Sequence, residues 1–525
     1  ELKEDPPEMQ HRTFKALIIM AVSYLMLLPL LGCSTDSFQT VQPNDSTKST
    51  DEIDEAPEKE ENIDSSQANP AAKDLISADQ ISFESEVLPV LENHCVLCHA
   101  EGTAGAFHMK LDIASDATAY AFAIGRLVES GDMPPWPASE KSPQFIGDHS
   151  ITSDQKEAVL KWANQGGAID VDPNRKMLSQ RPVMTINNPD LIVTSASGPY
   201  QGSTDTLDDY RCVIFDPNVD ETKWILASHF VPDKVEVVHH GIFTLASSEY
   251  RDQAERLDRA DPGVGWSCYG GNGLSEQTDG YKFGFGGWAP GDPPEISPKG
   301  YGVPLRPGDF LIIQLHYHFD YSAPPDLSQM LFDFASTEQL EANGGSFKTL
   351  TGQLFRGPAE IPCYEGDQHP LCDRDTAIRR AVELYGDAGY ASNFFNRECG
   401  FTPEDYAHMT NGTATSSCDI PVKATGKVIS VTGHMHELGL SIRLTLNPDT
   451  ENERILLDIP DWDFQWQFNY HPVESIILKD GDIIRVDCAW NRERAPYEAI
   501  GYILWSLGTG DEMCYSGITT APSDH

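Results

Sequence analysis

The order of apolar and polar positions divides this chain into segments of different character. Residues 16–31 form one apolar run, whereas residues 34–80 contain few apolar positions. In 153–162 apolar residues recur with a period near four, which predicts a helix with Ser153 at its N-cap. Beyond Pro173 short apolar stretches alternate with Gly, Pro and Asp, and no long helical period precedes 373–385. This part therefore predicts antiparallel β architecture.

Length and charge bound the class of protein. A chain of 525 residues is too long for one hydrophobic core and indicates three or four domains. The formal net charge is −44, from 37 basic and 81 acidic residues. This excess of acid excludes nucleic acid as a partner and adhesion to an anionic lipid surface, and it fits a solvated acidic surface.

The apolar run has the flanks of a secretory leader, predicted over 1–33. Arg12 and Lys15 supply positive charge before it, and it ends at Leu30-Leu31-Gly32-Cys33, which is a lipobox. A membrane-spanning helix needs ~20 apolar residues, so we expect export with a lipid on Cys33 rather than a transmembrane anchor. Ser34 follows the cysteine, and the bacterial lipoproteins that this pattern resembles are sent to the outer membrane.

The stretch 34–80 is rich in Ser, Thr, Asn, Pro and acid. Its few apolar residues cannot offset the entropy that ordering would cost. We therefore predict a disordered acidic tether between the lipid and the body of the protein.

A Cys-x-x-Cys-His motif lies at Cys95, Cys98 and His99. Two thiols at this spacing add to the vinyl groups of haem, and the adjacent imidazole reaches the iron. The motif predicts one covalently bound haem c with His99 as its proximal ligand, in a small all-α cytochrome c domain over 81–172. A zinc knuckle or a thioredoxin-like dithiol would not require the histidine.

The distal haem ligand must lie downstream of the motif. Met133 stands in a Gly-Asp-Met-Pro-Pro-Trp turn of the kind that class I cytochromes c use, and we predict it as this ligand. Met109 and His108 are alternatives. The helix at 153–162 is expected to cover the haem edge.

The β region carries histidines at spacings that suit a metal. His434 and His436 stand two positions apart, so both imidazoles share one face of a strand while Met435 points away. Met513, near the C-terminus, offers a thioether, which suits copper(I) better than a hard cation. Two histidines and a methionine indicate a copper site.

Three further histidines form a second candidate site: His239, His240 and His316. Adjacent residues on a regular strand face opposite ways, so His239 and His240 can share a metal only where the strand bends, and Gly241 permits such a bend. His318 is assigned to a structural role, although it lies two positions from His316 on the same face and is an alternate ligand.

Other polar and aromatic residues near these motifs have weaker signals. Gln314 shares the face of His316 and is expected to orient a ligand. His471 and Met435 are assigned to structural roles. The aromatic run 462–470 either lines a cleft or belongs to the core.

Taken in order, His-His, Gln-x-His-Tyr, His-x-His and Asp-Glu-Met-Cys resemble the type II copper, ascorbate-dependent monooxygenases, the family of peptidylglycine α-hydroxylating monooxygenase and dopamine β-monooxygenase. The resemblance covers about residues 199–517, and four ordered motifs are more specific than any one of them. It implies two copper ions, an electron-transfer copper held by His239, His240 and His316, and a dioxygen-binding copper held by His434, His436 and Met513.

The resemblance also implies two tandem jelly-roll-like β-sandwich domains with the substrate cleft between them. We expect these domains over 173–338 and 339–525. The second carries a helical, cysteine-rich insertion at about 356–418 that matches nothing in the family and is a candidate cover for the cleft.

Cysteine usage agrees with export. Eleven cysteines, less Cys33 and the two of the haem motif, leave eight, which is consistent with four disulfides in an oxidising compartment. The resemblance implies the pairs Cys212–Cys268 and Cys488–Cys514. The remaining four are expected to pair among themselves with open connectivity: Cys363, Cys372, Cys399 and Cys418.

The function that the resemblance implies is hydroxylation of a C–H bond of a small organic substrate by dioxygen. In the family, ascorbate reduces both metals. The fused haem domain instead predicts that electrons arrive through the haem, from a cytochrome, a quinol-linked carrier or an ascorbate-like reductant.

A further departure from the family and two alternative functions limit this prediction. The amidating enzymes anchor the substrate carboxylate with an arginine and a tyrosine at positions that are Thr432 and Gly517 here, so peptide amidation is not predicted. A haem and copper electron carrier without substrate chemistry, or a lipoprotein that only binds copper, would carry the same ligand motifs.

Overall fold

The computed structural model describes residues 80–522, apart from 182–184, 207, 269–271, 275–285, 291, 320–321, 495–500 and 507–509. The chain divides into two compact units, Glu1–Ala68 and Asn69–His525, and all described residues belong to the second. The predicted leader, and the tether up to residue 79, lie outside the described residues. No helix within the described ranges is long and apolar enough to cross a membrane.

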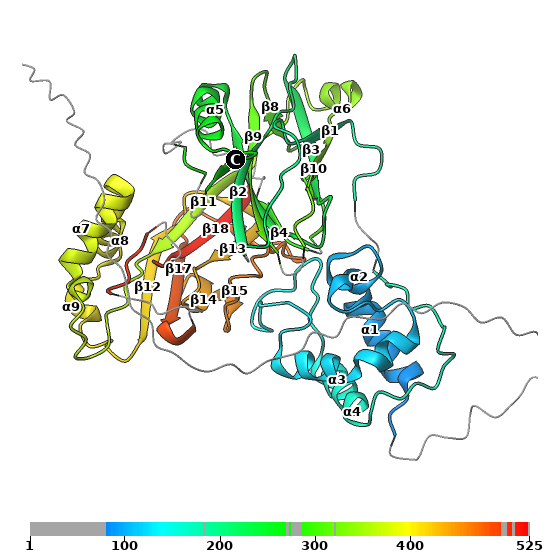
Figure 1. Cartoon of the computed structure of the whole chain (residues 1–525). Helices are drawn as coiled ribbons and strands as arrows, with labels where there is room; N and C mark the ends of the chain where they lie inside the picture. Colours follow the sequence, from blue (N-terminus) through cyan, green and yellow to red (C-terminus); the bar gives the residue numbers. More distant parts are fainter. Residues whose placement is uncertain are drawn as a thin grey trace, which may run out of the picture. The chain divides into compact units, whose positions relative to one another are not determined.

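The first described segment is helical, drawn in blue and cyan in Figure 1. Its core includes Phe83 and Trp162, whose ring centroids lie 5.6 Å apart. The last helix of the segment is capped by Thr152, whose hydroxyl accepts the N–H of Gln155, so the predicted N-cap Ser153 is the first helical residue instead. The elements are η1 (Phe83–Val87), α1 (Leu88–His94), α2 (Val96–His99), η2 (Ala104–Phe107), α3 (Ala114–Ser130) and α4 (Ser153–Asn164).

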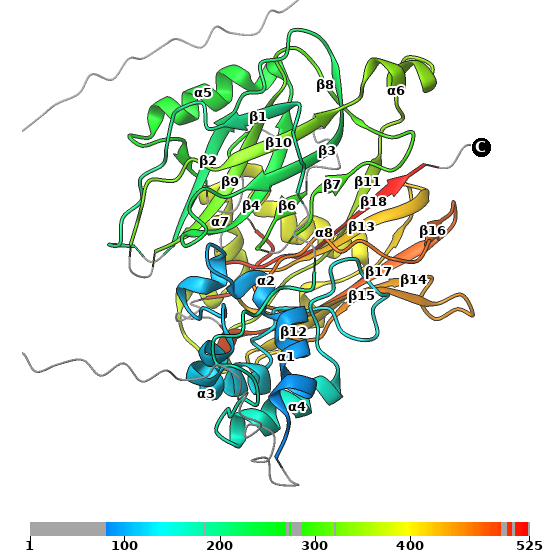
Figure 2. The ribbon, with the colours of Figure 1, turned by 90° about the vertical axis from the view of Figure 1, so that its right-hand side faces the viewer.

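Two five-stranded antiparallel sheets follow and share one apolar core, here called the first β-sandwich. The ring centroid of Phe230 in one sheet lies 5.5 Å from that of Phe243 and 5.3 Å from that of Trp288 in the other. One sheet contains β1 (Leu191–Thr194), β10 (Gln329–Phe334), β3 (Lys223–Val231), β7 (Glu295–Ile296) and β8 (Val303–Leu305). The other contains β5 (Trp266–Ser267), β2 (Asp208–Phe215), β9 (Phe310–His318), β4 (Val238–Ala246) and β6 (Gly287–Trp288), and several of these strands lie side by side in Figure 2.

Helices in this part were not predicted from the sequence. A ten-residue helix, α5 (Arg251–Ala260), follows η3 (Ser248–Tyr250), and α6 (Thr337–Ala342) follows the last strand. Of the residues in α5 only Ala254 is fully buried, and Ala254, Leu257 and Ala260 are its only apolar residues, so the helical pattern is too short to stand out from the surrounding sequence. The antiparallel β architecture predicted beyond Pro173 therefore also contains helices.

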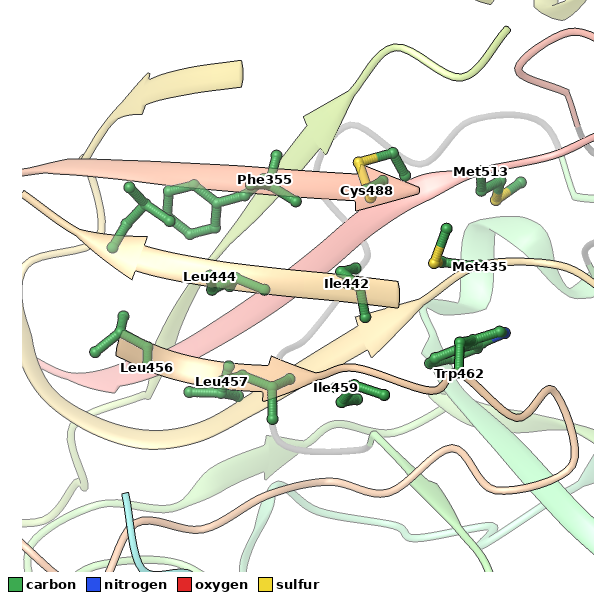
Figure 3. Packing of buried hydrophobic residues seen from close by; sticks show 14 of the residues in the cluster. Phe355, Met435, Ile442, Leu444, Leu456, Leu457, Ile459, Trp462, Cys488 and Met513 are labelled. Atoms are coloured by element: carbon green, nitrogen blue, oxygen red, sulfur yellow. A yellow bond between two sulfur atoms is a disulfide. The ribbon is translucent and has the colours of Figure 1, made fainter. Parts of the chain in front are cut away.

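Two four-stranded antiparallel sheets form the second β-sandwich around one core (Figure 3). Ile442, Leu444 and Leu457 are fully buried in this core. One sheet contains β11 (Thr351–Gly357), β18 (Cys514–Ala521), β13 (Gly426–His434) and β16 (Ile477–Leu478). The other contains β12 (Thr413–Pro421), β17 (Ile483–Asn491), β14 (Gly439–Leu446) and β15 (Arg454–Ile459), and η6 (Arg492–Arg494) follows β17.

The prediction of a β-rich fold with antiparallel sheets and additional helices is confirmed. The expected boundary between the two β domains falls inside α6. Among the described strands, no sheet combines strands from before and after this helix. Residues just beyond the expected end of the helical domain still pack with it, because Met177 is buried in its core and donates its N–H to Asp112 O.

The insertion contains η4 (Pro370–Cys372), α7 (Arg374–Tyr385), η5 (Gly386–Tyr390), α8 (Ala391–Cys399) and α9 (Pro403–Tyr406). From α8, the ring centroid of Phe395 lies 4.7 Å from that of Trp505, and the Ser392 hydroxyl accepts the backbone N–H of Trp505 at 2.7 Å. The insertion therefore supports the segment 501–506.

Four disulfides join the described cysteines, and Cys95 and Cys98 are unpaired. The implied pairs Cys212–Cys268 and Cys488–Cys514 are confirmed. The connectivity that the sequence left open is Cys363–Cys372 and Cys399–Cys418.

Candidate metal centres and their shared cavity

The structure brings His239, His240 and His316 together. The Nδ1 atom of His240 lies 3.3 Å from Nδ1 of His239 and 3.3 Å from Nδ1 of His316. Ligand atoms of all three lie within 4.8 Å of one another. One ion that binds two nitrogens at ~2.0–2.1 Å in a tetrahedral arrangement separates them by roughly 3.3 Å, so the spacing fits a shared metal.

A β-bulge explains how adjacent histidines reach one point. His240 pairs with His316 across β4 and β9, and the register shifts between Val238 and His240. The extra residue at His239 breaks the alternation of side chains, as bulges do. Gly241, which was expected to provide the bend, continues in regular register one position later.

Asp208 orients the three-histidine cluster. Its Oδ1 accepts the Nε2–H of His316 at 2.8 Å, which leaves the Nδ1 lone pair of His316 facing His240. The same oxygen accepts from Nδ1 of His318 at 2.8 Å, so the predicted alternate ligand is engaged outside the cluster. Tyr210 stacks on the His316 ring at 4.3 Å.

Burial favours the neutral imidazoles that metal binding requires. Desolvation lowers the pKa of His239 to about 3, with the nearby His316 and His318 adding to the shift. Desolvation also lowers the pKa values of His240 and His316. All three therefore keep free nitrogen lone pairs at neutral pH.

The second predicted set is held by two strand ends. His434 is the last residue of β13, His436 follows it, and Met513 immediately precedes β18. His434 donates from Nδ1 to Gln467 Oε1 at 2.6 Å, and His436 donates from Nδ1 to the Asp511 carbonyl at 3.0 Å. Each Nε2 is thereby left as the nitrogen with the lone pair.

Met435, between the two histidines, is fully buried in the core, as predicted for a structural residue. Figure 3 shows its side chain among the core residues, with Met513 near the start of β18. Because side chains alternate along a strand, His434 and His436 point to the side of the candidate metal site while Met435 points into the core.

Glu512 fixes the loops that carry the second set. Its buried carboxylate accepts the backbone N–H groups of His436, Leu438 and Met513 and the indole N–H of Trp490. Burial raises the pKa of Glu512, and these four donors oppose that rise. The sequence placed Glu512 in a motif but gave no sign of this role.

One cavity of about 500 Å³ is lined by one member of the first set of ligand candidates and by all three of the second. His240 lines it from the first β-sandwich, and His434, His436 and Met513 line it from the second. His434 is near enough to His240 to lower its pKa electrostatically. The run 462–470 divides between both expected roles, because Phe464, Gln467 and Phe468 line the cavity while Trp462 and Tyr470 are buried in the core.

The Cys-x-x-Cys-His motif lies at the α1–α2 junction. Cys98 lines a second cavity of about 590 Å³, within the range of small-molecule and cofactor sites. His99 is buried and donates from Nδ1 to the Met109 carbonyl at 2.7 Å, which leaves Nε2 as the nitrogen able to bind iron. Met109 therefore lies on the Nδ1 side of the imidazole, opposite a distal position.

Met133 is partly buried in the turn after α3. The described residues that line the second cavity include two histidines, His149 and His229. They do not include Met133. The structure therefore does not bring Met133 to the cavity at Cys98, and its role as distal ligand stays a prediction.

Aromatic side chains connect the helical segment with the three-histidine cluster. Trp136 contacts Phe468 at 5.4 Å between ring centroids, and Phe468 stacks with Trp466 at 6.1 Å. Trp466 lies 5.8 Å from the ring of His239. Two backbone hydrogen bonds also join the segment after α3 to the second β-sandwich. The N–H of Ile146 donates to the His471 carbonyl, and the N–H of Val473 donates to the Gln144 carbonyl.

The comparisons with protein-family models and with curated proteins found no match. Among solved structures, allantoicase is similar at 7% identity over 56% of this chain and 80% of its own, with a TM-score of 0.15. The infectious bursal disease virus VP2 subviral particle is similar at 10% identity over 64% of this chain and 74% of its own, with a TM-score of 0.14. Streptomyces albus HEPD is similar at 11% identity over 78% of this chain and 92% of its own, with a TM-score of 0.10. Likenesses this weak carry no argument about this chain.

Proposed function

We propose that this chain is a copper-dependent monooxygenase that hydroxylates a C–H bond of a small organic substrate with dioxygen. The observation that carries the proposal is one cavity lined by His240 of the three-histidine cluster on one side and by His434, His436 and Met513 on the other. Imidazole and thioether donors suit copper. The ordered motifs that resemble the type II copper monooxygenases support the same assignment.

The chain's own residues divide the work. Copper held by His434, His436 and Met513 would supply dioxygen activation. Gln467 and the Asp511 carbonyl orient the two imidazoles, as the hydrogen bonds at their Nδ1 atoms indicate. Phe464 and Trp505 form apolar walls of the cavity where the substrate would bind.

We also propose that Cys95, Cys98 and His99 hold one haem c and that Met133 completes the iron coordination. The cavity lined by Cys98 and the hydrogen bond that directs Nδ1 of His99 to the Met109 carbonyl support the attachment. Met133→Ala is expected to remove the methionine-to-iron absorption band while the haemochrome of the unfolded protein still shows covalent haem. Persistence of the band, or its loss in Met109→Ala instead, would refute the distal assignment.

Electrons are proposed to reach the coppers from the haem domain. The Trp136, Phe468 and Trp466 contacts toward His239 support this route. The donor would be a cytochrome, a quinol-linked carrier or an ascorbate-like reductant. We propose that the protein works outside the cytoplasm, anchored by a lipid on Cys33 at the outer membrane.

Oxygen uptake tests the proposal against its alternatives. Purified full-length protein is expected to bind two coppers per chain and to consume one dioxygen per hydroxylated product when reductant and substrate are present. Mass spectrometry with labelled dioxygen would locate one labelled oxygen atom in the product. A pure electron carrier or a copper-binding lipoprotein would give reductant oxidation, or no turnover, without labelled product.

A further inference from the structure

Arg356 stands in line with the second set of ligand candidates. On β11 it pairs with Tyr515 of β18, and Tyr515 pairs in turn with His434 of β13. Directly opposed residues in antiparallel strands share a face, so the three side chains form a row across the sheet. All three line the cavity, and the Arg356 guanidinium lies 5.9 Å from the centre of the Tyr515 ring.

The charge of the cavity is unlike that of the chain. Although the protein has a formal net charge of −44, no aspartate or glutamate is among the described residues that line the cavity. Arg356 is the one permanently charged side chain among those residues. A bound organic cation would meet this charge unfavourably, whereas an anion would be attracted.

Arg356 also has unused hydrogen-bonding capacity. Its Nε is buried and has no hydrogen-bond partner within the described structure. A guanidinium offers five donors in a planar fork that matches a carboxylate, and leaving a buried donor unpaired is unfavourable. A ligand with carboxylate oxygens would satisfy this donor.

The site differs from the carboxylate anchor of the amidating enzymes. Thr432 and Gly517, at the family's anchor positions, pair with each other across β13 and β18, and Gly517 donates its N–H to the Thr432 hydroxyl at 3.1 Å. Arg356 comes from β11, on the far side of β18. The cation is therefore supplied by a strand that the resemblance does not assign.

We propose that Arg356 binds a carboxylate on the substrate and that the substrate is an organic acid with an apolar body. The inference rests on the proposed function. Phe464, Phe468 and Trp505 line the cavity and give the body apolar contacts. Strands two apart are separated by about 10 Å, so a chain of several carbon atoms fits between Arg356 and His434.

Isothermal titration of the full-length protein with 4-phenylbutyrate, 4-phenylbutyramide and phenylphosphonate tests this. The wild type is expected to bind the acid more tightly than the amide or the phosphonate, with and without copper. Arg356→Gln should weaken acid binding roughly 10- to 100-fold and leave amide binding unchanged. Arg356→Lys should restore part of the difference because it keeps the charge but not the fork.

Arg485→Gln is the matched control, because Arg485 lies on β17 and pairs with Asp419 away from the cavity. It should leave acid binding unchanged. No measurable acid binding by the wild type, equal binding of acid and amide, tighter binding of the phosphonate, or equal acid affinity in folded Arg356→Gln would each overturn the proposal. Copper content, measured separately, distinguishes these results from failure of the proposed function.

Discussion

Replacing Met513 with leucine is expected to abolish hydroxylation while the protein stays folded. Met513 is nearly buried beside the cavity, and a Met-to-Leu exchange conserves volume, so the loss of stability should stay below about 1.5 kcal/mol. Turnover should fall by more than roughly 100-fold, since residues that only orient a metal ligand already change activity about 10- to 100-fold. X-ray absorption of the copper(I) protein should lose its copper–sulfur shell.

Met435→Leu is the matched control for this variant. Met435 stands between His434 and His436 in sequence and is buried in the core. The same exchange there should keep the copper–sulfur shell and most of the turnover. A sulfur shell that persists in Met513→Leu and disappears in Met435→Leu would reverse the assignment. Equal activity of both variants would contradict a role for sulfur in the reaction.

The histidine motifs were predictable because their information is local. A spacing of two positions on a strand is enough to place His434 and His436 on one face. The order of the four motifs indicated the other ligand candidates. The β-rich class followed from short apolar stretches between turn residues. Two of the disulfides followed from the resemblance.

What the sequence did not predict depends on residues far apart in the chain. Asp208 reaches His316 over more than a hundred positions, and Arg356 lies beside His434 only because β18 pairs with both of their strands. The bend was expected at Gly241, two residues after the bulge at His239, because register arises from pairing with β9 and not from Gly241 alone. No local period encodes such contacts.

The haem domain is expected to be required for electron delivery by a protein carrier and dispensable for a small reductant. His99→Ala should abolish turnover driven by a reduced cytochrome, because its imidazole is the proposed proximal ligand. Turnover with ascorbate should continue, since a small reductant can reach the copper ligands from the cavity. Equal carrier-driven turnover with and without His99 would refute the route and leave the haem without a part in catalysis.

Trp466 tests the path itself in protein with intact haem. Anaerobic rapid mixing with one equivalent of reduced cytochrome should show haem reduction, then haem reoxidation that coincides with loss of the copper(II) resonance signal as the electron passes to copper. Trp466→Leu is expected to slow only the second phase, because electron transfer slows steeply when a gap opens between Phe468 and His239. Reduction of copper by ascorbate should be unchanged.

Trp224→Leu provides the control for losing a partly buried indole elsewhere in the fold. Trp224 lies on β3 and packs on Phe347, outside the chain of contacts that runs from Trp136 to His239. Both phases should keep their rates in this variant. If Trp224→Leu and Trp466→Leu slow the second phase equally, the effect reflects general loosening of the β-sandwiches. If neither slows it, the electron takes a path that does not use these aromatic rings.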